Sequence, residues 1–233
     1  MDAISACALV RAKLCFLGSS CIYPVLDRPI KESDLMTGPL EPTNRAYAIA
    51  KIAGIEMCRA YATQYGLRCV ILMPCNLYGP GRWSQDTHVI NMLMKRMHAA
   101  KESGEKSIEI WGDGTPLREF MHVDDLAEAC VHFMNADLEP AQILNVGTGQ
   151  EVTIQELANM LRLIIYPSLE LRFTGHLNGA PRKLLDSSLA RSLGWAPKRE
   201  LPLSLAHLYG EFTLYTRSAA SPQSRHTCRG HQP

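Results

Sequence analysis

Short apolar runs alternate with longer amphipathic segments along this chain of 233 residues. Short, mostly apolar runs favour strands that are buried on both faces of a parallel sheet. Strands are therefore predicted at residues 14–18, 67–73, 107–111, 142–146 and 169–173. Gly18 ends the first run and Pro74 follows the second, and both residue types favour the end of a strand.

The segments between several of these runs repeat apolar positions with the period of a helix. Helices are predicted at residues 45–65, 86–103, 124–135, 187–193 and 202–217, with another that begins at Thr153. Asn44 is expected to cap the first helix, and Gly66 and Gly104 are expected to end the first two. Thr153 and Glu156 have the spacing of a capping box.

This alternation of strands and helices indicates an α/β fold, a partial Rossmann-type doubly wound parallel sheet with a smaller C-terminal α/β region. Residues 24–44 are rich in Pro, Asp, Glu and Thr and are interpreted as a surface loop, and the polar tail at 218–233 is expected to be disordered. A dinucleotide-binding fold opens with a strand, a glycine-rich loop and a helix, and nothing before Gly18 matches that unit. The chain is therefore expected to be a later portion of such a fold.

Composition narrows the class of protein. Hydrophobic residues make up 46% of the chain, charged residues 20%, and the net charge is +1. No long basic run is present, so neither nucleic acid nor a membrane surface is an expected partner. The eight cysteines form no Cys-x-x-Cys pair, so no metal site is expected, and a reducing, cytoplasmic setting is predicted.

The candidate chemistry centres on Tyr47 and Lys51, which are four residues apart and so lie on one face of the predicted helix. An ammonium beside a phenol favours the phenolate, which eases proton transfer near neutral pH. Ser19, at the end of the first predicted strand, can complete a donor set around a carbonyl oxygen. This arrangement suits hydride transfer to or from a carbonyl.

Several longer motifs follow one another in a distinctive order. They are Gly18-Ser-Ser-Cys-Ile-Tyr-Pro24, Leu40-Glu-Pro-Thr-Asn44, Tyr47-Ala-Ile-Ala-Lys-Ile-Ala-Gly54, Asn76-Leu-Tyr-Gly-Pro80, His88-Val-Ile90, Trp111-Gly-Asp-Gly-Thr-Pro-Leu-Arg-Glu-Phe120, His122-Val-Asp-Asp125, Asn145-Val-Gly-Thr-Gly149 and Pro181-Arg-Lys-Leu-Leu-Asp186. Over roughly residues 14–215 the chain resembles the GDP-L-fucose synthases, a family of extended short-chain dehydrogenase/reductases.

The resemblance implies a two-step reaction with NADPH as cofactor. A GDP-4-keto-6-deoxy-D-mannose substrate is epimerised at C3 and C5, and its C4 ketone is then reduced to give GDP-L-fucose. It also implies that residues 1–85 are the remaining part of a dinucleotide-binding domain. Residues 86–217 would form a mixed nucleotide-sugar region whose strands return to the core sheet, and the complete protein would be a homodimer.

Catalytic roles follow from the same resemblance. Cys21 and His88 are the candidate base and acid of epimerisation. Tyr47 would protonate the C4 oxygen, Lys51 would favour its phenolate and bond the nicotinamide ribose, and Ser19 would hold the carbonyl. The charges of Asp124 and Asp125 would suit a catalytic role. A role in stabilising the N-terminus of a helix is the better interpretation of both residues.

The resemblance implies two further sets of contacts. The expected cofactor-binding residues are Leu17, Gly18, Ser19, Ser20, Lys51, Pro74, Cys75, Asn76, Leu77 and His88. The expected substrate-binding residues are Arg96, Trp111, Arg118, Asn178 and Lys183. Arginine suits a diphosphate because its guanidinium forms bidentate hydrogen bonds. The alternatives are a solvated helix charge for Arg96 and a core aromatic for Trp111.

Two other interpretations of the sequence remain open. A related nucleotide-sugar epimerase or dehydratase would share Tyr47 and Lys51 but would not need Cys21 and His88. A truncated, non-catalytic paralogue would fold poorly or bind only a partner. Because no glycine-rich loop precedes Gly18, the 233-residue chain is itself expected to show little NADPH-dependent activity and poor solubility.

Overall fold

A computed structural model describes residues 3–81, 83, 88–175 and 180–220. One group of elements surrounds a three-stranded sheet: α1 (Ala3–Leu9), β1 (Leu14–Leu17), α2 (Arg45–Tyr65), β2 (Cys69–Pro74), α4 (Val123–Asn135), β6 (Gln142–Val146) and α6 (Ser188–Ser192). A second group comprises β3 (Asn76–Tyr78), α3 (Val89–Ser103), β4 (Ser107–Ile110), β5 (Leu117–His122), β7 (Glu151–Thr153), α5 (Ile154–Ile165), β8 (Glu170–Phe173), β9 (Arg182–Lys183) and α7 (Leu201–Ala220). Short 3-10 turns lie at η1 (Ser20–Ile22), η2 (Glu32–Asp34) and η3 (Pro42–Asn44).

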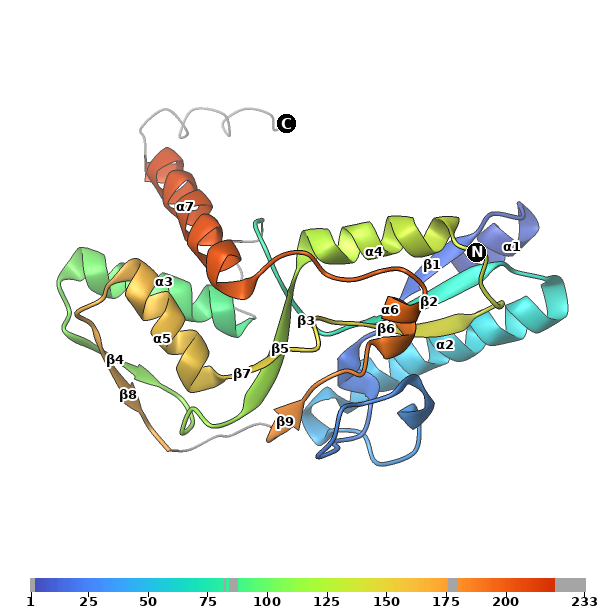
Figure 1. Cartoon of the computed structure of the whole chain (residues 1–233), viewed down its shortest axis with the longest axis horizontal. Coiled ribbons are helices and arrows are strands. Elements are labelled where there is room, and N and C mark those ends of the chain that lie inside the picture. The colour runs from blue at the N-terminus through green and yellow to red at the C-terminus, as the bar shows by residue number, and fades with distance from the viewer. Residues whose placement is uncertain (1–2, 82, 84–87, 176–179, 221–233) are drawn as a thin grey trace, which may run out of the picture.

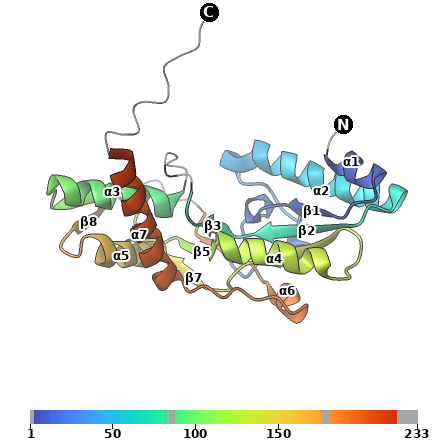
Figure 2. The same cartoon turned by 90° about the horizontal axis from the view of Figure 1, so that it is seen from above.

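The first sheet has the strand order β1-β2-β6, and both pairings are parallel. Every residue of β2 is buried, as its apolar sequence predicts for a central strand. Helix α2 covers one face of the sheet and α4 the other, as the two views show (Figures 1 and 2). The predicted doubly wound α/β fold is confirmed, and the strands predicted near 14–18 and 67–73 are parallel neighbours.

The second group builds a separate apolar core from α3, α5, α7 and the strands beside them. β5 pairs with β3 and β9 in parallel and with β7 in antiparallel orientation, and β4 pairs with β8. β3, β5, β7 and β9 were not predicted as strands. They are short and carry many polar residues, so their extended form depends on long-range pairing rather than on a local pattern.

Most predicted helices begin or end within a few residues of their observed bounds. Gly66 and Gly104 end α2 and α3 in the left-handed conformation, with φ of 66° and 73°. Thr153 forms the predicted capping box with Glu156. Asn44 occupies the predicted N-cap position of α2, but its side chain forms no capping hydrogen bond and donates to the Glu41 carboxylate instead.

The segment 24–44 is less loop-like than its composition suggested. Ile30 is buried and forms a β-bridge to Leu185. The Arg28 guanidinium bonds both oxygens of the Asp34 carboxylate at 2.8 Å. Because of this pairing the pKa of Asp34 is lowered to about 2, although the burial of the carboxyl acts to raise it.

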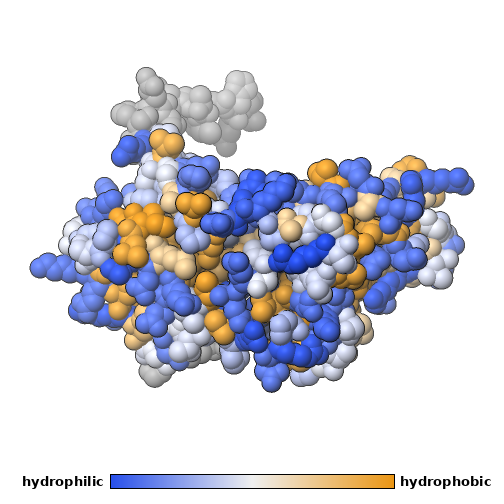
Figure 3. Space-filling view, in the orientation of Figure 1, coloured by the Kyte–Doolittle hydropathy of each residue, from blue (hydrophilic) through white to orange (hydrophobic). Residues whose placement is uncertain are grey.

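The surface mixes polar side chains with scattered apolar ones (Figure 3). The exposed large apolar residues include Leu203 and Leu214 on α7, and Leu9 at the end of α1. Helix α7 runs to Ala220, beyond the predicted end near Arg217, and the rest of the predicted tail lies outside the described residues. Among the described residues, no helix combines the length and hydropathy needed to cross a membrane.

Candidate active site

The loop after β1 places the first two candidate catalytic residues. Ser19 caps η1, and its hydroxyl oxygen accepts a hydrogen bond from the Cys21 backbone N–H at 3.1 Å. A hydroxyl that accepts in this way still has its own proton to donate. Gly18 passes close to β2, because a Cβ there would lie 2.3 Å from the Met73 sulfur. Ser19 can therefore donate to a carbonyl oxygen beyond the carboxyl end of the sheet.

Tyr47 and Lys51 lie together on α2, as the sequence predicts. The Lys51 ammonium is 5.8 Å from the centre of the Tyr47 ring and donates to the Leu17 carbonyl at 2.8 Å. The Tyr47 side chain is half-exposed. Lys51 is thus fixed between the end of β1 and the tyrosine, while the tyrosine ring stays accessible.

Gly54 determines how closely α2 approaches the sheet. A Cβ at this position would lie 2.4 Å from the tip of the Phe16 ring, so no larger residue fits without movement. The Lys51 ammonium lies 5.5 Å from the centre of the same ring. Gly54 therefore allows α2 to lie close to β1.

Cys21 faces a charged residue from far along the chain. The Lys183 ammonium lies 3.7 Å from the Cys21 sulfur and 3.5 Å from a carboxylate oxygen of Glu41. The pKa of Glu41 is lowered; burial acts to raise it, but Lys183, Asn44 and Thr43 together outweigh burial. Residues that are separate in the sequence therefore meet in one polar cluster.

Arg118 lies beside this cluster. Arg118 and Lys183 are register partners on the parallel strands β5 and β9. The Arg118 guanidinium donates to the carbonyls of Leu117 and Ala180 at 2.8 and 2.7 Å. Burial lowers the pKa of Arg118, while the nearby Glu41 and Cys21 act to raise it. A partly buried guanidinium held in this way is suited to an anionic ligand group.

A cavity of about 250 Å³ brings together residues from both predicted sets. Its lining includes Asn76 and Leu77 from β3, Arg118 from β5, and His88 at the N-terminus of α3. His88 is exposed, and its side chain does not cap the helix. The Asn76 amide donates to the Glu119 carbonyl, which fixes its direction. Candidate acid, cofactor and substrate residues thus share one cavity.

Arg96 and Trp111 both lie near the end of β4. The Arg96 guanidinium donates to the Glu109 carbonyl, two residues before Trp111. Trp111 is 65% exposed, so the alternative of a core aromatic does not hold. Neither side chain lines the 250 Å³ cavity.

Four other expected contact residues remain: three are buried, and one lies outside the described residues. Pro74 and Cys75 are buried, and burial, with Glu119, raises the pKa of the Cys75 thiol well above its usual range. Only backbone groups of these residues could reach a ligand. Ser20 is buried as well. Asn178 lies outside the described residues.

Two buried polar residues that sequence reasoning missed hold the site together. The Glu119 carboxylate accepts from the backbone N–H groups of Gly149 and Leu185 at 2.7 and 3.0 Å. Asn145 accepts from the Tyr23 hydroxyl at 2.8 Å and donates to the Ile30 carbonyl. Both belong to motifs that were noted in the sequence, but the pattern does not reveal that their polar groups point inward.

Asp125 has a related structural role. Asp124 and Asp125 lie in the first turn of α4, as expected, but His122 caps the helix by accepting from the Asp124 N–H at 3.2 Å. The Asp125 carboxylate is buried and bonds the Arg199 guanidinium at 2.7 Å. It therefore ties α4 to the segment that leads into α7.

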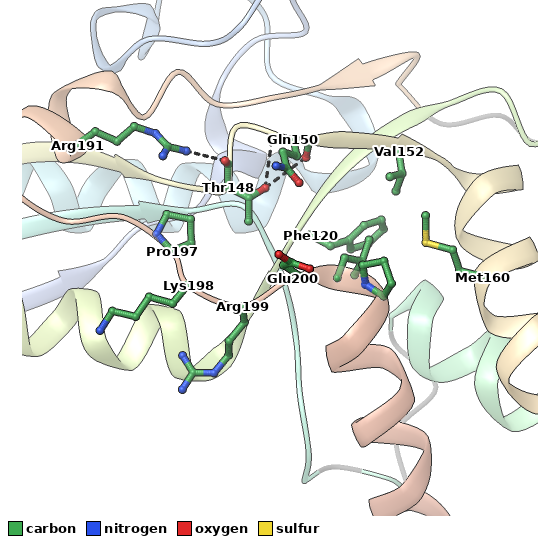
Figure 4. A pocket seen from close by; sticks show the side chains of 12 residues that line it. Phe120, Thr148, Gln150, Val152, Met160, Arg191, Pro197, Lys198, Arg199 and Glu200 are labelled. Carbon is green, nitrogen blue, oxygen red and sulfur yellow. Dashed lines mark hydrogen bonds between the residues drawn. The ribbon is translucent and has the colours of Figure 1, made fainter.

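A second cavity, of about 400 Å³, lies between β5, the loop at 147–150 and the start of α7 (Figure 4). It contains none of the predicted site residues. Lys198 and Arg199 point from it toward α4, where they pair with Glu128 and Asp125. The Arg191 guanidinium donates to the Thr148 carbonyl. We assign no catalytic role to this cavity, because the cationic side chains of Lys198, Arg199 and Arg191 already pair with groups of the protein itself.

Residues 1–147 match the model of the NAD dependent epimerase/dehydratase family. The chain belongs to that family. The parallel sheet with helices on both faces and the Tyr47–Lys51 pair at its edge agree with this membership.

Curated members of the NAD dependent epimerase/dehydratase family include close relatives of the chain. GDP-L-fucose synthase 1 of Arabidopsis thaliana is 48% identical over 207 residues, which cover 84% of this chain and 62% of the relative. GDP-L-fucose synthase of Escherichia coli (strain K12) is 45% identical over 212 residues, which cover 86% of this chain and 66% of the relative. The chain thus spans less than two thirds of the length of these relatives.

Solved structures are also similar to the chain. A GDP-mannoheptose C4 reductase from Campylobacter jejuni with NADP bound has a TM-score of 0.80 and is 35% identical, with 90% of this chain and 71% of that chain covered. A GDP-L-fucose synthetase from Naegleria fowleri bound to NADP has a TM-score of 0.84 at 21% identity, with 94% and 71% covered. At that identity the second likeness shows the fold alone.

Proposed function

We propose that this chain carries the catalytic part of a GDP-L-fucose synthase. The reaction would be 3,5-epimerisation of GDP-4-keto-6-deoxy-D-mannose, followed by NADPH-dependent reduction at C4. The observation that carries the proposal is the coexistence of two reactive sets, Tyr47 with Lys51 and Cys21 with Lys183, around the carboxyl end of one sheet. The similarity to curated GDP-L-fucose synthases supports it.

Epimerisation needs a base and an acid beside a ketone. The C4 ketone acidifies the hydrogens at C3 and C5, because the electron pair of each C–H bond can move into an enolate. The Cys21 thiolate would accept the proton, and His88 would return one to the opposite face of the carbon. His88 lines the 250 Å³ cavity with Arg118, which is beside Cys21 and Lys183.

Reduction at C4 needs a proton for the ketone oxygen. Tyr47 would give that proton, and the Lys51 ammonium would favour the phenolate that remains. Ser19 would hold the same oxygen through its hydroxyl. The Lys51 hydrogen bond to the Leu17 carbonyl keeps its ammonium in place for this role.

The residues present fit the nicotinamide end of NADPH. Ser19 follows β1 and Asn76 follows the neighbouring strand β2, while Lys51 on α2 reaches the Leu17 carbonyl at the end of β1. Sheets of α/β proteins bind ligands at the carboxyl ends of their strands. The bound cofactor would supply the hydride for C4. Gly18 allows a close backbone approach there, whereas Pro74 and Cys75 could contribute only through the backbone.

Arg118 would bind an anionic group of the GDP-sugar, with Lys183 on the adjacent strand as a second cation. Trp111 and Arg96 would contact a more distant part of the same ligand. A homodimer and a cytoplasmic location are also proposals. Exposed apolar residues of α2, such as Ile49 and Met57, support a partner surface.

The activity is testable in a chain that carries a glycine-rich dinucleotide-binding unit from an NADP-binding relative ahead of Leu14. With GDP-4-keto-6-deoxy-D-mannose and NADPH, the expected product is GDP-L-fucose. A product reduced at C4 but unchanged at C3 and C5 would instead favour a C4 reductase, such as the Campylobacter jejuni neighbour. No product in a folded sample would refute the assignment.

A further inference from the structure

A carboxylate lies among the cations that are proposed to bind the anionic group of the ligand. One Glu41 carboxylate oxygen is 3.5 Å from the Lys183 nitrogen, and the two side chains are only 22% and 13% exposed. Arg118, which is the register partner of Lys183, lines the 250 Å³ cavity. Because these groups are largely covered, water screens their charges less than it would at an open surface.

The segment that carries Glu41 holds its carboxylate in place. The Asn44 amide donates to the oxygen that faces Lys183, at 3.2 Å, and the Thr43 hydroxyl donates to the other oxygen at 3.4 Å. Burial acts to raise the pKa of Glu41, but Lys183, Asn44 and Thr43 together outweigh burial and lower it. Glu41 is therefore an anion at neutral pH, and it is fixed beside Lys183.

Arg118 experiences the same carboxylate. Burial lowers the pKa of Arg118, and the nearby Glu41 acts to raise it. In the described part of the chain, the hydrogen bonds of this guanidinium go to the carbonyls of Leu117 and Ala180, which carry no net charge. The Glu41 carboxylate thus offsets part of the positive charge that Arg118 and Lys183 present to a ligand.

The contact between Glu41 and Lys183 is long in comparison with the neighbouring ion pair on β9. The Arg182 guanidinium binds both oxygens of the Glu151 carboxylate, at 2.8 and 2.9 Å. Charged hydrogen bonds of this kind are short, and a contact of 3.5 Å is weaker. Lys183 can therefore exchange Glu41 for an anionic group of a ligand, whereas Arg182 is held by Glu151.

We propose that Glu41 is an internal counter-ion of the anion site, which competes with the anionic group of a ligand for the Lys183 ammonium. The competition lowers the affinity for every anion, and it favours a group with enough charge to displace a fixed carboxylate. A diphosphate is the chemical class that fits this requirement. The identity of the ligand as a GDP-sugar rests on the proposed function, but the competition does not.

The test measures the affinity of the 233-residue chain for GDP and for inorganic pyrophosphate by isothermal titration calorimetry. Guanosine serves as a ligand without phosphate groups. Glu41→Gln removes the charge and keeps the size of the side chain, whereas Glu41→Asp keeps the charge. Glu170→Gln is the matched control, because it removes an exposed carboxylate that pairs with Arg172 on β8.

Glu41→Gln should bind GDP and pyrophosphate about tenfold more tightly than the wild type, because a repelling charge and a competitor for Lys183 are both lost. Glu41→Asp and Glu170→Gln should keep the wild-type affinity, and guanosine should show no gain in any variant. A loss of structure weakens binding, so it cannot imitate the expected gain.

An unchanged or weaker affinity of Glu41→Gln for either ligand would overturn the proposal, and so would the absence of binding in both chains. An equal gain in Glu41→Asp would overturn it as well, because the shape of the side chain would then be the cause. A gain for guanosine would do the same, since that ligand carries no charge.

These outcomes are independent of the proposed activity, because the titrations need neither NADPH nor turnover. A gain in Glu41→Gln together with no GDP-L-fucose formation in the chain with the added dinucleotide unit would sustain the competition and refute the function. Activity together with an unchanged affinity would do the reverse.

Discussion

Glu119 shows how a single buried carboxyl can hold the surroundings of a site. Its oxygens accept from Gly149 on the loop after β6 and from Leu185 after β9. Burial raises the pKa of Glu119, although these N–H donors act in the opposite direction. Gly147 is required beside it, because a Cβ there would lie 2.4 Å from a carboxylate oxygen.

Glu119→Gln should destabilise the chain by about 1–3 kcal/mol, because an amide cannot accept from both N–H groups and one buried donor would lose its partner. The free energy of unfolding in urea measures this. Glu56→Gln is the control, since Glu56 is exposed and its pair with Arg59 lies on the surface of α2. Equal stability of the two variants would contradict the role given to Glu119.

At the scale of single residues, the sequence predicts the candidate catalytic side chains better than it predicts the buried polar contacts that hold the site together. Tyr47 and Lys51 fall on one helix face because helical spacing is local. Glu119, Asn145 and Asp125 are buried by contacts with distant segments, and a charged or polar letter in a sequence normally indicates exposure. The Cys21–Lys183 contact joins residues 162 positions apart, so no local pattern could predict it.

Among the elements, α2 packs closely against β1. The helix passes over Phe16 at Gly54, and the same helix carries Tyr47 and Lys51. Helices α2 and α4 and the three strands of the first sheet were predicted because their patterns are long or mostly apolar. β7 and β9 were missed because they have only three and two residues and exist through their pairing with β5.

Gly54→Ala should cost about 1–3 kcal/mol, because the new methyl group would overlap the Phe16 ring and force α2 outward. Thermal and urea unfolding measure the loss. Gly210→Ala in α7 is the matched control. Nothing lies within 4 Å of a Cβ at Gly210, so that variant should gain up to about 1 kcal/mol from helix propensity. A neutral Gly54→Ala variant would show that the approach of α2 is not tight.

At the scale of the whole molecule, the residues proposed to contact a dinucleotide all address its nicotinamide end. Lys51, Ser19 and Asn76 could contact the nicotinamide and its ribose, and residues 1–17 contain no glycine. A glycine-rich loop normally holds the pyrophosphate through backbone N–H groups.

The 233-residue chain should therefore bind NADPH at least ~10³-fold more weakly than the same chain with a glycine-rich unit ahead of Leu14, since each 1.4 kcal/mol is tenfold. Fluorescence titration of both samples measures the ratio. The Lys51→Met variant of the longer chain is the control, because it removes the nicotinamide-side donor alone. Saturable micromolar binding by a monodisperse 233-residue sample would contradict this prediction.

The central claim is that one site holds two separable sets of catalytic residues. The most direct measurement follows both half-reactions at once, in deuterium oxide, in the chain that carries the added dinucleotide unit. Deuterium incorporation at C3 and C5 reports epimerisation, and NADPH consumption reports reduction. Cys21→Ser should lose incorporation by about 10²–10⁴-fold and reduction by less, whereas Tyr47→Phe should lose reduction by a similar factor and keep incorporation. Equal loss of both signals in both variants would contradict the account.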